Sequence, residues 1–186
     1  MSALVAGVAA YTVLATLLIA CAAHLSRPTA LPRALAAHRV LPAAPVVATV
    51  VTASEGLLGG AGAAALVQRD GTLLAAALAG SVLLLALFGG YGWYVRAIGR
   101  SGPCGCSRAP LPMTGWVVAR AFALAGLALT GLVLSDAVVP LTRTGTVLVV
   151  VLLAAATFTC LLWQLPAAMH DPVRSPMGAE GGVVHL

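Results

Sequence analysis

Five long apolar runs, separated by short polar segments, constrain the fold of this chain more than any other feature of its sequence. A helix needs about 20 apolar residues to cross the hydrocarbon core of a bilayer, and each run reaches that length. The runs do not alternate polar and apolar residues, as spanning strands do, so the sequence predicts helices. The predicted spans are residues 4–23, 43–67, 73–95, 116–139 and 146–165.

The composition agrees with a chain that lies in lipid. Of the 186 residues, 61% are hydrophobic and 8% charged, whereas a soluble domain has about 45–50% apolar and about 25% charged residues. We therefore predict an all-α protein, a polytopic transmembrane helical bundle with a four-helix core and a fifth, C-terminal span. Residues 1–166 form its single domain, and residues 167–186 are expected to be a polar, disordered tail.

The basic residues are ten arginines, and they give the chain a net charge of +5. They flank the apolar runs and form no basic face, so we expect the lipid bilayer and no nucleic acid as a partner. The first run follows no positively charged segment and extends to about Ala23, which indicates a retained span rather than a cleaved signal.

The first and third connections, around residues 24–42 and 96–115, must lie on the same side of the membrane, called side A below. Side A connections hold six arginines and the opposite ones hold two, so the positive-inside rule predicts a cytoplasmic side A. All four cysteines also lie toward side A. The side A arginines are Arg27, Arg33, Arg39, Arg96, Arg100 and Arg108, and the cysteines are Cys21, Cys104, Cys106 and Cys160.

The third connection contains the residues that most resemble a reactive centre, Cys104 and Cys106, with a glycine between them. Glycine permits the turn that brings two such thiols to bonding distance, and the tight ring would be strained and easily exchanged. Arg100 and Arg108 favour the thiolate form of nearby thiols. A close thiolate pair can alternatively bind a soft metal such as Cu(I) or Hg(II).

Two charged residues lie within predicted spans. Glu55 falls in the middle of the second span, where an ionised carboxylate is costly and indicates function, although a structural hydrogen bond explains it equally well. Arg120 lies one turn into the fourth span, where it can pair with Glu55, stabilise a thiolate or extend to the headgroups. Cys21 and Cys160 are interpreted as small apolar fillers.

Several of these residues together resemble a known family, the MauE-type methylamine utilisation membrane proteins, which are related to the DoxX-like helical bundles. The resemblance covers residues 3–165. Its matching segments are His38-Arg39-Val40-Leu41-Pro42, Glu55-Gly56-Leu57-Leu58-Gly59, Arg100 with Gly102, Cys104-Gly105-Cys106, and Trp116 with Arg120.

The resemblance implies a multi-pass protein of the cytoplasmic membrane that helps to form or shuffle disulfides in the methylamine dehydrogenase small subunit. It implies a periplasmic thioredoxin-like partner, and this conflicts with the cytoplasmic side A that the arginines predict. By analogy with DsbB and vitamin K epoxide reductase, electrons would pass from the thiols to a quinone. The expected catalytic residues are Cys104, Cys106, Glu55 and Arg120, and Arg120 and Trp116 are expected to contact the quinone.

Two other functions remain open at the level of the sequence. The first is a soft-metal transporter that captures its ion with Cys104 and Cys106, although the chain lacks the Met-rich or His-rich tracts of many such proteins. The second is a membrane scaffold without catalysis, in which the cysteines are incidental.

Overall fold

The computed structural model describes residues 1–100 and 114–169, and within these ranges the secondary structure consists of helices joined by short connections, with no strand. Five of the helices are long and apolar enough to cross a membrane, which confirms the predicted all-α bundle. The elements are α1 (Ser2–Ser26), α2 (Ala30–His38), α3 (Ala44–Gln68), α4 (Gly71–Ala97), α5 (Gly115–Val133), a short 3-10 helix η1 (Ser135–Ala137) and α6 (Thr146–Ala168).

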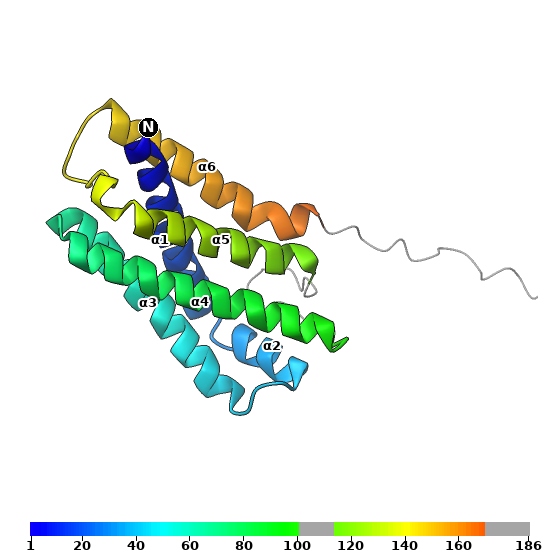
Figure 1. The fold of residues 1–186 in the computed structure, drawn as a ribbon. Helices are drawn as coiled ribbons and strands as arrows, with labels where there is room; N and C mark the ends of the chain where they lie inside the picture. The colour runs from blue at the N-terminus through cyan, green and yellow to red at the C-terminus, as the bar shows by residue number, and fades with distance from the viewer. Residues whose placement is uncertain (101–113, 170–186) are drawn as a thin grey trace, which may run out of the picture.

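Helix α1 lies at the centre of the bundle. It packs against α3, α5 and α6, while α4 closes the ring by packing against both α3 and α5 (Figure 1). Of the most apolar 18 residues of α1, 56% are buried inside the protein, against 33% or less in the other spanning helices. The arrangement is a four-helix core of α1, α3, α4 and α5, with α6 added along α1 and α5.

Small residues let α1 and α3 approach closely. Three glycines on α3 are spaced one turn apart, and each faces a larger side chain of α1. Such glycines allow helices in lipid to gain the van der Waals contact that replaces the hydrophobic effect as a driving force. The pairs are Gly56 with Cys21, Gly59 with Leu18, and Gly62 with Leu14.

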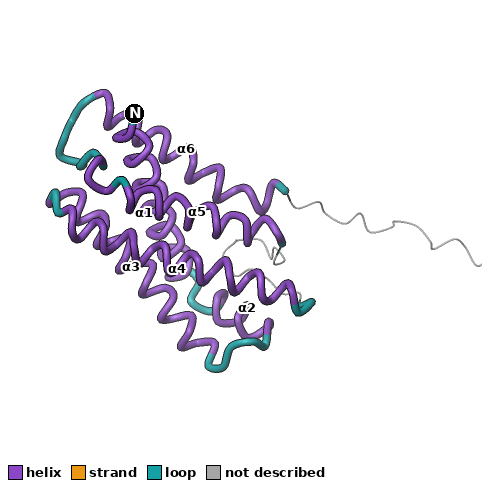
Figure 2. The backbone as a smooth tube through the Cα atoms, viewed as in Figure 1, coloured by secondary structure: helices purple, strands orange, loops and turns teal. Residues whose placement is uncertain are grey.

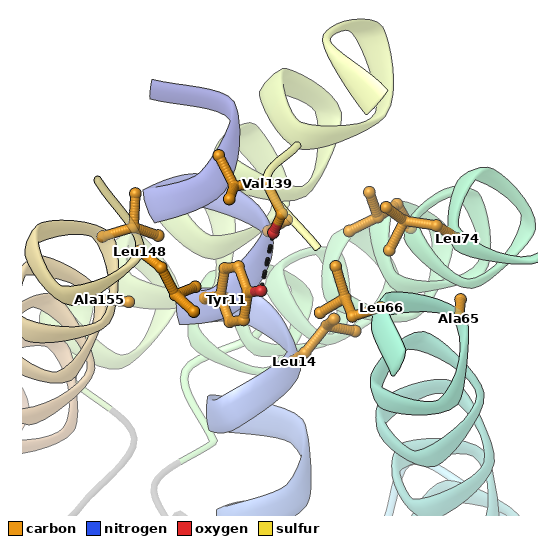
Figure 3. Close-up of a cluster of buried hydrophobic side chains, with 11 residues drawn as sticks. Tyr11, Leu14, Ala65, Leu66, Leu74, Val139, Leu148 and Ala155 are labelled. Atoms are coloured by element: carbon orange, nitrogen blue, oxygen red, sulfur yellow. Dashed lines mark hydrogen bonds between the residues drawn. The ribbon is translucent and has the colours of Figure 1, made fainter. Parts of the chain in front are cut away.

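The apolar core away from side A contains one buried polar anchor, Tyr11 of α1. Its ring packs among leucines, valines and alanines from α1, α3, α4 and α6, and its hydroxyl donates a hydrogen bond of 2.8 Å to the carbonyl of Val139 (Figure 3). This bond fixes the connection that follows α5. An unpaired hydroxyl would be costly at this depth, so the bond also makes the tyrosine compatible with the core.

The predicted fourth span, residues 116–139, is too long. Helix α5 ends at Val133, and the chain then makes the 3-10 turn Ser135–Ala137 and continues in an extended conformation at Val138. Ser135 and Asp136 favour turns over helix interiors, and Pro140 disfavours a helical residue before it. Helix α6, by contrast, continues to Ala168, three residues past the predicted end of the fifth span at Leu165.

At the end of the bundle opposite side A, the loops are short and mutually bound. The Asp70 side chain accepts a hydrogen bond of 3.0 Å from the Leu73 amide and so caps α4. The Arg69 Nε donates a hydrogen bond of 2.7 Å to the Thr142 hydroxyl, which joins the two connections (loops in Figure 2).

On side A, the first connection contains the short helix α2. Leu31 and Leu35 of α2 pack against Ala44 and Ala48 of α3. The buried His38 at the end of α2 shares a hydrogen bond of 3.0 Å between its Nδ1 and the Tyr91 hydroxyl of α4. Helix α2 is therefore held against both α3 and α4.

The glycine contact between α1 and α3 can be tested with a matched pair of substitutions. A Cβ on Gly62 would stand 2.3 Å from a Leu14 methyl carbon, whereas a Cβ on Gly60 meets nothing within 4 Å. We expect Gly62→Val to lower the free energy of unfolding by about 1–3 kcal/mol more than Gly60→Val, because overpacking is costly. Reversible unfolding in detergent micelles measures this difference, and equal losses in the two variants would contradict the packing argument.

Candidate functional site

A buried pair of ionisable side chains joins α1 and α3 near side A. Glu55 of α3 is 2% exposed and His24 of α1 is 6% exposed, and the His24 Nε2 lies 3.6 Å from the Glu55 Oε2. This separation exceeds hydrogen-bond length, so the contact between the two side chains is electrostatic. The Glu55 Oε2 accepts no hydrogen bond from the part of the protein that the structure describes.

Arg120 of α5 approaches the same pair from a third helix. Its positive charge acts on the Glu55 carboxylate, and its guanidinium lies 5.4 Å from the ring centre of Trp163 on α6. A cation over an aromatic face is attracted by the negative face of the ring, most strongly where water is excluded. Trp163 therefore helps to hold the half-buried Arg120 near Glu55.

A free thiol lies beside this group. Cys21 precedes His24 by one helical turn, and its Sγ lies 3.0 Å from the position that a Cβ on Gly56 would occupy. Gly56 directly follows Glu55, so only a glycine at this position leaves room for the sulfur. Residues of four helices thus meet near side A: Cys21 and His24 from α1, Glu55 from α3, Arg120 from α5 and Trp163 from α6.

The predicted site residues divide into three groups. Glu55 and Arg120 lie close enough to interact, whereas Cys104 and Cys106 fall outside the described residues. Trp116 begins the same helix as Arg120, but it is 42% exposed, and the ring next to the guanidinium is Trp163. Cys160, which the sequence suggested as a filler, is an exposed free thiol.

Sequence reasoning missed two members of the group, His24 and Trp163. The first apolar run of the sequence ends at Ala23, which places His24 in a polar connection. In the structure α1 continues to Ser26. Trp163 does not stand out in the sequence, because aromatic residues near the ends of spanning helices commonly form a belt at the membrane interface. Their involvement depends on which helices are neighbours, and the only signal in the sequence was their shared position toward side A.

Arg100 connects the end of α4 to the first connection. Its Nη1 donates a hydrogen bond of 2.7 Å to the His38 carbonyl and a second bond to the Arg39 carbonyl. These carbonyls end α2, where partners for the last C=O groups are needed and a positive charge is favourable. The last described residue before the Cys-Gly-Cys segment is therefore bound to α2.

The chemistry available to the group follows from its residue types. A histidine next to a carboxylate can take up and release a proton, and a half-buried arginine can stabilise an anion such as a thiolate. Among residues 1–100 and 114–169, no three His, Cys, Asp or Glu side chains are grouped so that they could hold a metal ion.

Comparison with known proteins gives one match. The sequence model of the family described as "Methylamine utilisation protein MauE" matches residues 1–134 of the 186. The matched region contains α1 to α5 and leaves out α6, which carries Trp163. No curated protein and no solved structure matches the chain.

The interaction between His24 and Glu55 can be measured with a double-mutant cycle. We expect His24→Gln and Glu55→Gln each to destabilise the bundle, because each leaves a buried polar partner uncompensated. The double variant should lose about 1–3 kcal/mol less than the sum of the two, since residues in contact are coupled by such amounts. Unfolding in micelles gives the four free energies.

A matched control for this cycle is Asp136→Asn, which changes an exposed carboxylate at the other end of the bundle. Its effect should add to that of His24→Gln within the error of the measurement. Strict additivity of His24→Gln and Glu55→Gln would show instead that the two side chains do not interact.

Proposed function

The chain belongs to the MauE family of methylamine utilisation proteins, and from this premise we propose that it is a membrane thiol–disulfide exchange protein that assists maturation of a partner. Its five membrane-spanning helices make it a multi-pass membrane protein. Within the proposal, Cys104 and Cys106 are the exchanging thiols, because the sequence places them in a polar connection between two spanning helices.

One observation carries the proposal: the connection that holds the two cysteines lies on the same side of the bundle as the group of ionisable side chains. Helix α4 ends at Ala97 and α5 begins at Gly115 on the side of the bundle where His24, Glu55 and Arg120 meet, and the Cys-Gly-Cys segment connects these two helix ends. Ionisable side chains buried inside the membrane are costly, and such residues usually mark a functional site. The reactive thiols and the groups that can manage protons and anions would therefore act on the same side.

The proposed reaction is an exchange of one disulfide for another. The thiolate of Cys104 or Cys106 attacks one sulfur of a partner disulfide, that S–S bond breaks, and a mixed disulfide forms. The second thiolate of the pair then attacks the mixed disulfide and releases the partner as a dithiol. One disulfide is lost and one is gained, two protons pass from the pair to the partner thiols, and the reverse sequence oxidises a partner dithiol.

The partner classes follow from the family. We propose a thioredoxin-like protein as the exchange partner, with the methylamine dehydrogenase small subunit as the protein that matures, and the cytoplasmic membrane as the location. His24 is added to Glu55 and Arg120 as a group that supports the exchange. Arg120, steadied by Trp163, is the cation best placed to stabilise an anion at this site.

The thiols of the pair can be tested by substitution. We expect Cys104→Ser and Cys106→Ser each to abolish maturation of the partner, because exchange needs both an attacking and a resolving sulfur. Helix content and stability should stay unchanged, and the exposed Cys160→Ser serves as the matched control that retains activity. Partner disulfides counted by mass spectrometry give the readout, and full maturation with the double variant would disprove the proposal.

The side on which the pair acts can be determined by labelling intact cells with a membrane-impermeant maleimide. We use a Cys21→Ser, Cys160→Ser background so that only Cys104 and Cys106 remain. A role with a periplasmic partner predicts labelling of intact cells, and labelling only after prior reduction would identify a resting disulfide. Labelling that requires permeabilised cells would place the pair in the cytoplasm, as the arginine count predicts, and would contradict a periplasmic partner.

A further inference from the structure

The charges of the described residues are divided unequally between the two ends of the bundle. Five exposed arginines lie at side A, and the acidic residue nearest to them, Glu55, is buried against His24. At the opposite end two arginines and two aspartates cancel, so the exposed charges there sum to 2 − 2 = 0. The side A arginines are Arg27, Arg33, Arg39, Arg96 and Arg100, and the opposite group is Arg69, Asp70, Asp136 and Arg143.

Arginines of side A lie where spanning helices end, which is the region where a bilayer has its headgroups. Arg27 directly follows the end of α1, and Arg96 lies in the last turn of α4. Three large aromatic side chains with an amphipathic ring are exposed among them. They are Trp93 at 68%, Tyr94 at 53% and Trp116 at 42% exposure, and such rings concentrate at the interface between hydrocarbon and water.

One of these arginines lies against a helix N-terminus. The Arg96 Nη1 is 2.6 Å from the position that a Cβ on Gly115 would occupy, at the first residue of the 19-residue helix α5. The first-turn N–H groups of a helix and its dipole carry partial positive charge, and the guanidinium adds a full one. Within residues 1–100 and 114–169 no acidic side chain forms an ion pair with Arg96, and two positive groups held side by side favour an anion between them.

We propose that side A binds the phosphodiester headgroups of anionic phospholipids. A guanidinium matches two phosphate oxygens with parallel hydrogen bonds, and the interleaved aromatic rings fix it at the depth where those phosphates lie. An acidic protein surface would also attract the charge. The lipid is favoured because the arginines lie where spanning helices end, among side chains that contact the bilayer interface.

Tryptophan fluorescence tests the proposal directly, because all three tryptophans of the chain belong to side A. The full-length protein is placed in vesicles that contain brominated phosphatidylglycerol or brominated phosphatidylcholine, and quenching gives the relative affinity for the two lipids. We expect preference for phosphatidylglycerol at low salt, because each arginine near an anionic lipid contributes about fivefold. Salt near 1 M should reduce the preference, since it shortens the screening length to about 3 Å.

Substitutions at the two ends of the bundle show whether the lipid preference comes from the side A arginines or from the net charge of the protein. Arg27, Arg33 and Arg96 make no side-chain hydrogen bond or ion pair within the described parts of the chain, and replacing all three with Gln should lower the preference at least tenfold. Arg143→Gln at the opposite end should leave it unchanged. Equal quenching by both lipids in the unmodified protein, or an unchanged preference in the triple variant, would overturn the proposal whether or not a variant folds less well. Binding of polyglutamate to the protein in phosphatidylcholine vesicles, with no lipid preference, would point to an acidic protein instead.

Discussion

The absence of water inside the bilayer is the constraint on which the rest of the structure depends. Every backbone N–H and C=O must find its partner within the protein, which leaves helices as the solution for a chain with this pattern. The same absence of water removes the hydrophobic effect as a force between helices, so they associate through close packing. The central position of α1 and its glycine contacts with α3 are the result, and the bond from Tyr11 to the Val139 carbonyl satisfies one buried hydroxyl within the bundle.

The candidate site is a consequence of this packing. Helices α1 and α3 cross so that Gly62, Gly59 and Gly56 face α1 in succession, and the next residues along the crossing are His24 and Glu55. The close approach that glycine permits therefore also brings the two ionisable side chains together. Arg120 supplies a compensating charge from α5, and Trp163 from α6 covers it. Helix α6, which contacts the site through Trp163, lies beyond the region that the family model matches.

Side A combines the features that matter for function. The hydrogen bond from Arg100 to the His38 carbonyl ties the chain just after α4 to the end of α2. The arginines on the same side explain why the positive-inside rule opposes a periplasmic thiol site. Their attraction to lipid phosphates would act on either side of the membrane, so the charge can serve binding at the interface as well as topology.

The sequence by itself determined the class of the protein, its spans and the family resemblance, because run length and composition decide whether a segment crosses a bilayer. It also singled out Glu55 and Arg120, since an ionisable residue inside an apolar run can be recognised from the sequence alone. The tertiary structure decided which residues surround them. His24 and Trp163 joined the group because α1 and α6 lie beside α3 and α5, and helix neighbours are not encoded in hydropathy. Helix α5 ends at Val133 because a polar turn and a proline follow it. The average hydropathy of the whole apolar run predicted a longer helix.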